Sequence, residues 1–156
     1  MAIKFDTYEI LWPNGRAAGF AWGDASVLRF WFRYFDRYRS LIEIGNTKAL
    51  AQIIKNDYPI YSGLVLERWF RQRMMESYRY ANIGSWWVPK QGEPYEIDIV
   101  AVTIEGGVEA YEVKRQRKKY SPALLESKVA EMQKHLFKGK VIQTACLSLE
   151  DMWGRK

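Results

Sequence analysis

Residues 95–114 read Y-E-I-D-I-V-A-V-T-I-E-G-G-V-E-A-Y-E-V-K and predict two adjacent β-strands. β-Branched and apolar residues dominate both halves, and Gly106 and Gly107 permit a tight turn between them. In the second strand, Glu112 and Lys114 are two residues apart. Because the side chains of a strand alternate between its faces, these two should lie on the same face of the sheet.

The first of these strands carries an acidic residue, Asp98, near its start. Alternation places it on one face with Val100, Val102 and Ile104. A carboxylate at the end of an apolar row is costly unless it is paired. Asp98 and Glu112 on neighbouring strands, with Lys114 beside one of them, indicate a site for a hard divalent cation assisted by a positive charge.

The segment before the strands predicts a long helix over residues 59–80, opened by Pro59. Helical spacing gives it an apolar stripe made of Ile60, Leu64, Phe70, Met74 and Tyr78. Glu67 falls in the middle of that stripe. It either reaches out at the edge of the helix or faces a positive group, which a metal site would supply.

Glu67 on a helix, Asp98 on a strand and Glu112-Val113-Lys114 on the next strand resemble the PD-(D/E)xK nuclease superfamily, also called restriction-endonuclease-like. The resemblance implies an α/β fold with the order helix, three strands, helix, strand, and a mixed central sheet flanked by helices. It further implies that Glu67, Asp98, Glu112 and Lys114 are catalytic. Mg²⁺ or Mn²⁺ would be held by Asp98, Glu112 and the Val113 carbonyl, with Glu67 as a further ligand. Glu96, which alternation places on the same strand face as Asp98, is a lesser candidate that could substitute as a ligand.

A second resemblance lies closer to the N-terminus. Residues 24–34, D-A-S-V-L-R-F-W-F-R-Y, and residues 42–46, I-E-I-G-N, are similar to the C-terminal region attached to archaeal-type P-loop ATPases. In those proteins a short linker precedes a PD-(D/E)xK-like domain, which implies an ATPase as a partner. The sequence has no G-x-x-x-x-G-K-[ST] motif, so the ATPase module itself is not expected in this chain.

Residues 1–57 are expected to form an N-terminal segment, and residues 58–156 the nuclease-like domain. Residues 5–23 predict a hairpin around Pro13-Asn14-Gly15, similar to the wing of a winged-helix element. Asp24 can cap a helix over residues 25–40 whose apolar residues lie on all sides. That helix could meet a second copy of the chain or the ATPase, and its arginines either extend from a buried helix or contact nucleic acid. Thr47 should cap a short helix over residues 48–56.

A basic run, K-R-Q-R-K-K, occupies residues 114–119 directly after the predicted site. Such a run is either a solvated surface or a phosphate-binding one, and its position favours phosphate contacts by Arg115, Arg117, Lys118 and Lys119. Ser121 and Pro122 then begin a helix with a buried stripe of Leu125, Val129, Met132 and Leu136, followed by a final strand over residues 141–149. Lys128 or Gln133 of that helix could assist the site.

Composition bounds the class of protein. The chain has 156 residues, 48% of them hydrophobic, which suits one domain and an appendage. It contains no run of about 18 apolar residues that would span a membrane, and the single Cys146 allows no internal disulfide. The net charge of +6 fits a polyanionic partner.

Together these features predict a cytoplasmic, divalent-metal-dependent endonuclease or exonuclease that acts on DNA. Two alternatives are a catalytically silent nuclease fold that serves as a scaffold for an ATPase, and a simple DNA-binding protein.

Overall fold

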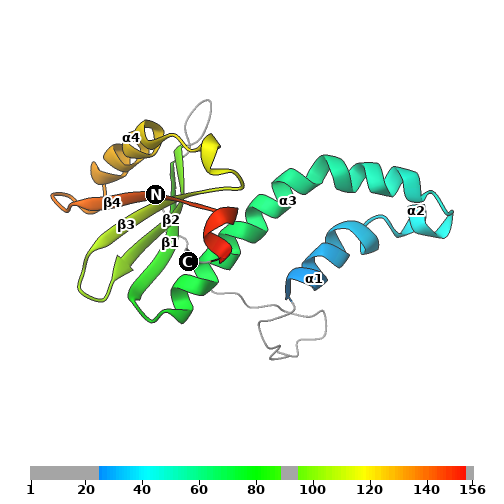
Figure 1. Ribbon diagram of the computed structural model, residues 1–156, viewed down its shortest axis with the longest axis horizontal. Helices are drawn as coiled ribbons and strands as arrows, with labels where there is room; N and C mark the ends of the chain where they lie inside the picture. The colour runs from blue at the N-terminus through cyan, green and yellow to red at the C-terminus, as the bar shows by residue number, and fades with distance from the viewer. Residues whose placement is uncertain (1–24, 89–94, 154–156) are drawn as a thin grey trace. The chain divides into compact units, whose positions relative to one another are not determined.

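The structure of the protein is a computed structural model that describes residues 25–88 and 95–153 (Figure 1). The hairpin expected over residues 5–23 lies outside this range. The described residues form two compact units, one of residues 25–65 and one of residues 66–153. The division expected after residue 57 falls inside a helix that contributes to both units, α3 (Thr47–Glu76), and stays a prediction.

The second unit contains a mixed four-stranded sheet with the spatial order β1-β2-β3-β4 (Figure 1). β1 (Tyr80–Val88), β2 (Tyr95–Thr103) and β3 (Val108–Lys114) pair antiparallel. The chain then passes through α4 (Pro122–Gln133) and returns as β4 (Ile142–Ser148), which pairs parallel to β3. The predicted α/β class, with a mixed sheet flanked by helices, is confirmed.

The turn between β2 and β3 forms where the two glycines predict it. Gly106 has a φ of +84°, a backbone conformation that L side chains rarely adopt, and its N–H donates to the carbonyl of Thr103. The Thr103 hydroxyl accepts the N–H of Gly107 at 3.0 Å. These contacts fix the register of β2 against β3, and with it the position of Asp98 relative to Glu112.

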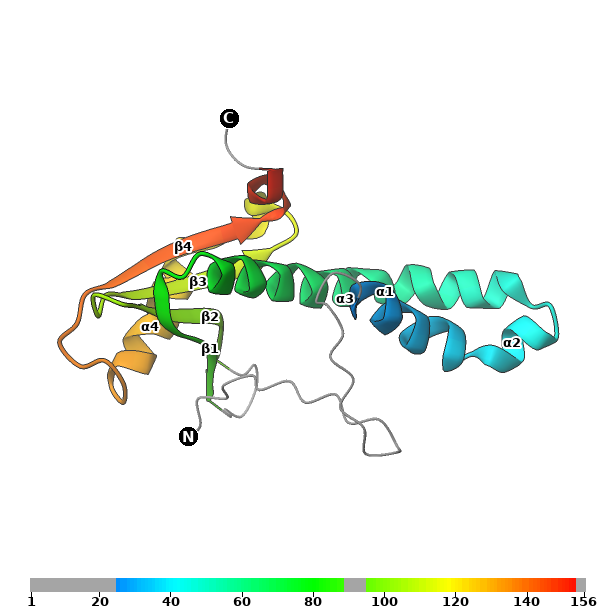
Figure 2. The ribbon, with the colours of Figure 1, turned by 90° about the horizontal axis from the view of Figure 1, so that it is seen from below.

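The sheet is covered by a helix on each face (Figure 2). On one face, α4 inserts the buried side chains of Leu125, Val129 and Met132 into a core with Trp86, Ile97, Val100, Val108 and Ala110. On the other face, Leu66 and Phe70 of α3 pack on Ile99. Acidic residues of β2 and β3 therefore lie between two helices that can bring further side chains to them.

The pairing of β1 with β2 contains a β-bulge at Asp98. Gly84 pairs with Val100 and Trp86 with Ile97, so two steps along β1 correspond to three along β2. Ile97 belongs to the core under α4, whereas Ile99 belongs to the core under α3. In a regular strand these two would share a face, so the bulge breaks the row that alternation predicts from Ile104 back to Asp98.

The expectation of two helices over residues 48–56 and 59–80 is wrong, because α3 runs without interruption from Thr47 to Glu76 with Pro59 inside it. The hydroxyl of Ser62 donates to the carbonyl of Tyr58, the residue before the proline, at 2.6 Å. Asn46, not Thr47, caps the helix, since its side-chain oxygen accepts the N–H of Ala49 at 3.2 Å.

The buried face of α3 differs from the predicted stripe. Ile60 and Leu64 are exposed, and Tyr78 lies beyond the end of the helix with a φ of 53°. Phe70 is buried as expected, and Leu66, one turn before it, completes the buried pair. Glu67 therefore sits at the edge of the face that packs on the sheet. No helix in residues 25–88 or 95–153 is both long and apolar enough to cross a membrane.

The first unit pairs an aromatic-rich helical segment with the N-terminal part of α3. α1 (Ala25–Phe30) continues into a π-helix, η1 (Trp31–Asp36), and α2 (Arg39–Glu43) follows, in place of one helix over residues 25–40. Tyr34 is buried and donates its hydroxyl to Asp57, which also receives two hydrogen bonds from Arg33. These contacts lower the pKa of Asp57 to about 2.

Two adjacent leucines of α4 test the packing of this helix on the sheet. Leu125 is 0% exposed and Leu124 is 50% exposed. Leu125→Ala should lower the free energy of unfolding by about 2–5 kcal/mol, because it leaves a cavity in the core. Leu124→Ala should change it by about 0.5 kcal/mol or less. Urea denaturation measures both, and equal losses would mean that α4 does not pack as described.

Candidate functional site

Side chains from β2, β3, α3 and α4 meet near the start of β2 and the end of β3. The backbone N–H of Val113 on β3 donates to Oδ2 of Asp98 on β2 at 2.6 Å. On the same strand, Nζ of Lys114 lies 2.7 Å from Oε1 of Glu112. Nζ of Lys128, from α4, lies 3.1 Å from each carboxylate oxygen of Glu112. The predicted grouping of an acid on β2 with Glu112 and Lys114 on β3 is therefore present.

Glu67 joins this group from α3 through an arginine on the same helix. Nη2 of Arg71 lies 2.5 Å from Oε1 of Glu67 and 2.6 Å from the backbone carbonyl oxygen of Asp98. The side chain of Arg71 is 12% exposed, so this bridge lies mostly out of solvent. It connects α3 to β2 at the bulge.

Glu112 is compensated by two lysines. Its burial raises the pKa of the carboxyl, but hydrogen bonds from Lys114 and Lys128 outweigh that effect and hold the pKa below its ordinary value. The residue is 5% exposed, so the carboxylate keeps its charge in a site that excludes most water. Burial lowers the pKa of Lys114, and the contact with Glu112 overcomes this and leaves it raised.

Asp98 stands in a less compensated environment. Burial raises the pKa of its carboxyl, the N–H of Val113 opposes that shift, and the nearby charge of Glu112 adds to it. Its Oδ1 atom receives no hydrogen bond from the described part of the chain, whereas Oδ2 is bound to Val113. Asp98 is thus a partly buried acid with an oxygen available to a further ligand.

Glu67 is perturbed most strongly among these acids. Burial raises the pKa of its carboxyl to about 7, Arg71 opposes the shift, and the charges of Asp98 and Glu96 increase it. The bridge through Arg71 to the backbone of Asp98 places Glu67 near the acidic part of β2. A carboxyl that titrates near neutrality is suited to proton exchange at physiological pH.

The oxygens of the three acids are not arranged as ligands of an ion here. Among residues 25–88 and 95–153, no group of three or more His, Cys, Asp or Glu side chains could hold a metal ion. The contacts explain this, because two lysines take the oxygens of Glu112 and Arg71 takes one oxygen of Glu67. The role expected for the Val113 carbonyl stays a prediction.

The basic run after β3 divides into two parts. Arg117 begins the short 3-10 helix η2 (Arg117–Lys119) and is paired with Asp151 and Glu150 of η3 (Leu149–Trp153), so its guanidinium holds the C-terminal part of the unit. Arg115, Lys118 and Lys119 are exposed. Of the four predicted phosphate-binding residues, these three present their side chains to solvent.

The structure selects between two residues of α4 that the sequence leaves open. Lys128 binds Glu112, whereas the side-chain amide of Gln133 donates to the backbone carbonyl of Lys140 at 2.7 Å. Each of the two is adjacent to a buried residue of the helix, Val129 for Lys128 and Met132 for Gln133, so the sequence alone does not distinguish them. Arg71, four residues after Glu67, is a site residue that sequence reasoning missed.

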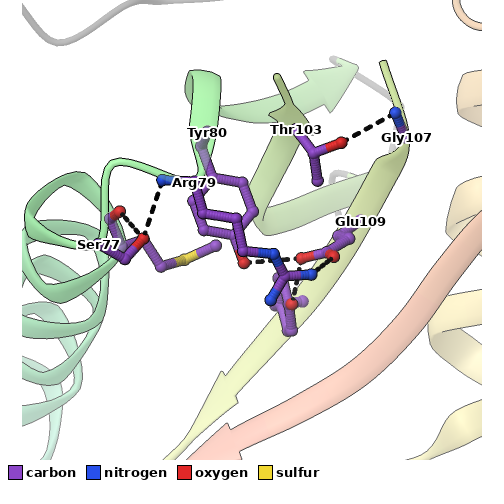
Figure 3. A network of polar contacts seen from close by, with 8 residues as sticks. Ser77, Arg79, Tyr80, Thr103, Gly107 and Glu109 are labelled. Atoms are coloured by element: carbon purple, nitrogen blue, oxygen red, sulfur yellow. Dashed lines mark hydrogen bonds and ion pairs between the residues drawn. The ribbon is translucent and has the colours of Figure 1, made fainter. Parts of the chain in front are cut away.

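A further buried acid, Glu109, shows what a fully satisfied carboxylate looks like in this fold (Figure 3). Arg79 is paired with Oε1 of Glu109, and the hydroxyl of Tyr80 donates to Oε2 at 2.8 Å. The Tyr111 hydroxyl donates to the same oxygen at 2.6 Å. Glu109 thus has a structural role, in contrast to Asp98.

A family model described as archaea bacterial proteins of unknown function, DUF234, matches residues 31–138. The chain belongs to the DUF234 family. No curated protein and no solved structure matches it significantly. All of the site residues named above, from Glu67 to Lys128, lie within the part of the chain that the DUF234 model covers.

The raised pKa of Glu67 predicts a pH-dependent stability. In the folded protein the Glu67 carboxyl stays protonated up to about pH 7, whereas a glutamate in the unfolded chain loses its proton near pH 4.5. Stability from this group is therefore complete below 4.5 and is lost as the pH rises through 7. The free energy of unfolding should fall by roughly 1–3 kcal/mol between about pH 5 and pH 8.

Urea denaturation at both pH values, on wild type and Glu67→Gln, measures this effect. The glutamine variant should lose most of the slope and be more stable than wild type at the higher pH. Glu126→Gln removes an exposed acid of the same unit and should keep the slope. An unchanged slope in Glu67→Gln would show that Glu67 does not titrate in this window.

Proposed function

We propose that this DUF234 protein is a divalent-metal-dependent nuclease that hydrolyses DNA phosphodiester bonds on a restriction-endonuclease-like core. The observation that carries the proposal is the grouping of Asp98 on β2 with Glu112 and Lys114 on β3, joined by the hydrogen bond from Val113 to Asp98. The element order α3-β1-β2-β3-α4-β4 supports it, because the resemblance to PD-(D/E)xK nucleases implies the same order.

The chemistry of the donors suits Mg²⁺ or Mn²⁺, which would require the carboxylates to leave their present ion pairs. Asp98, Glu112 and Glu67 supply hard carboxylate oxygens, and Oδ1 of Asp98 is available to a ligand. Burial raises the pKa of Asp98 and the charge of Glu112 adds to the shift, and a cation bound between the two acids would relieve this repulsion. When bound, such an ion polarises a phosphate and lowers the pKa of a water molecule.

The side chains around these acids have distinct roles in the proposed reaction. Lys114, whose side chain is 35% exposed, can reach a phosphate and stabilise the negative charge that develops on it. The carboxyl of Glu67 can accept a proton from water near neutral pH because its pKa is about 7. Arg71 holds Glu67 beside Asp98 and positions it.

The DNA substrate would be held through the phosphates of its backbone. Arg115, Lys118 and Lys119 are exposed directly after the strand that carries Glu112 and Lys114, and the chain has a net charge of +6. Lysines and arginines that contact phosphates bind DNA without regard to sequence. We therefore expect binding that weakens with salt and that depends on the shape of the DNA more than on its bases.

A second candidate is a catalytically silent nuclease fold that binds DNA or a partner protein. The ion pairs of Glu112 with Lys114 and Lys128, and of Glu67 with Arg71, favour it, because they satisfy these acids without a metal. Association with a P-loop ATPase belongs to both candidates and rests on the resemblance of residues 24–34 and 42–46. Trp31 and Phe32 of the first unit are about half exposed and could contact the ATPase or a second copy.

Cleavage assays with purified protein distinguish the two candidates. Wild type should cut linear or supercoiled DNA with Mg²⁺ or Mn²⁺ and stop when EDTA is added. Asp98→Asn and Lys114→Gln should each lower the rate about 100-fold or more, because they remove a ligand and a charge-stabilising group. Lys134→Gln, which removes an exposed lysine that follows α4, should leave the rate unchanged.

Two results would contradict the nuclease proposal. Equal cleavage by wild type, Asp98→Asn and Lys114→Gln would indicate a contaminating nuclease. Absence of cleavage by folded wild type with either metal, together with DNA binding that ignores EDTA, would favour the silent candidate.

A further inference from the structure

A cavity of about 200 Å³ lies between the sheet and the C-terminal end of α4. Its strand side includes Gly84 of β1 and Val100 of β2. Its helix side includes Met132, near the end of α4, and Leu136 and Phe137, which follow that helix. Since an apolar cavity of about 150 Å³ binds benzene, a cavity of this size can hold one ring or two fused rings.

The lack of a side chain at Gly84 contributes to this space. Gly84 pairs with Val100, whose side chain belongs to the core under α4. Directly paired residues of neighbouring strands point to the same face, so a side chain at position 84 would extend into the cavity. Gly84 is not among the glycines with a positive φ, and its backbone therefore does not require glycine. A glycine inside a strand often marks a place where a ligand approaches closely.

Trp86 brings an unpaired polar group to the cavity. The residue lines the cavity and is 2% exposed. Within residues 25–88 and 95–153, its indole nitrogen Nε1 has no hydrogen-bond partner. Buried N–H groups are almost always paired in folded proteins, because an unpaired one is unfavourable. A molecule held in the cavity could bring the indole N–H an acceptor.

The segment that follows α4 closes the cavity with a strained residue. Phe137 has a φ of 56°, in the left-handed region that bulky residues rarely adopt. Its half-buried side chain packs on the core together with that of Leu136. The N–H of Leu136 donates to the carbonyl of Met132 at 2.8 Å, which holds the segment against the helix end. Strain of this kind is common at binding sites.

We propose that this cavity is a binding site for a small neutral compound of one or two fused rings that carries one hydrogen-bond acceptor. The acceptor would pair with the Trp86 indole N–H, and the rings would contact Val100, Met132 and Leu136. None of the described residues that line the cavity is charged, so a charged ligand would lose its hydration without compensation. The inference does not rest on the proposed nuclease function, because this lining includes none of the acids of the candidate site.

Two ligands of the same shape test the inference on the full chain. Quinoline has two fused rings with one nitrogen acceptor, and naphthalene has the same rings without an acceptor. Quinoline should bind wild type about fivefold or more tightly than naphthalene, because it alone pairs with the indole N–H. NMR titration of isotope-labelled protein measures both affinities from the indole N–H signals. Quinoline should shift the Trp86 signal downfield and leave that of Trp87, which is 42% exposed, in place.

Three variants separate the acceptor contact from the shape of the cavity. Trp86→Phe keeps an aromatic ring without the N–H and should bind the two ligands with equal affinity. Gly84→Val places a side chain in the cavity and should weaken quinoline binding by about tenfold or more, because packed interiors leave no spare room. Trp87→Phe changes the neighbouring exposed indole and should bind quinoline as wild type does.

The wild-type titrations decide the matter even if urea denaturation shows that a cavity variant is unfolded. No saturable shift of the Trp86 signal with quinoline would overturn the inference. Equal affinity of wild type for quinoline and naphthalene would overturn it as well, since the indole N–H would then have no part in binding. In folded Gly84→Val, quinoline affinity equal to that of wild type would place the ligand outside this cavity, with the same consequence.

Discussion

The candidate site depends on the compensation of one buried carboxylate, Glu112, which lies on β3 and is 5% exposed. An ionised carboxylate in such a place is strongly unfavourable unless it is paired. Lys114 pairs with it along the same strand, and Lys128 reaches it from α4. The packing of α4 on the sheet is therefore coupled to the chemistry of the site, because the helix that fills the core also carries a counter-charge.

The environment of the second acid, Asp98, differs from that of Glu112. The bulge in β2 breaks the alternation at this residue, and the N–H of Val113 holds one of its oxygens. Burial raises the pKa of the Asp98 carboxyl, and the nearby charge of Glu112 adds to that shift. In Glu109, by contrast, both carboxylate oxygens already accept hydrogen bonds, from three donors in all. The contrast separates acids that stabilise the sheet from acids that could bind a ligand.

Part of this arrangement could be predicted from the sequence, because local signals determine it. Alternating β-branched residues and Gly106-Gly107 predict the paired strands, and the spacing of Leu125, Val129 and Met132 predicts the buried face of α4. Features that depend on three-dimensional packing could not. Pro59 suggests a helix start, yet α3 continues through it. Neither the bulge at Asp98 nor the choice of Lys128 over Gln133 has a local signal strong enough to decide it, since both follow from how the elements pack.

The central claim is that Asp98 and Glu112 bind a divalent ion together. Anomalous diffraction from crystals of the full chain grown with Mn²⁺ and a short phosphorothioate DNA duplex tests it most directly. We expect a strong anomalous peak within about 2.0–2.4 Å of a carboxylate oxygen of each residue. A structure in which DNA is bound, no peak lies between the two carboxylates, and Glu112 still contacts both Lys114 and Lys128 would contradict the account.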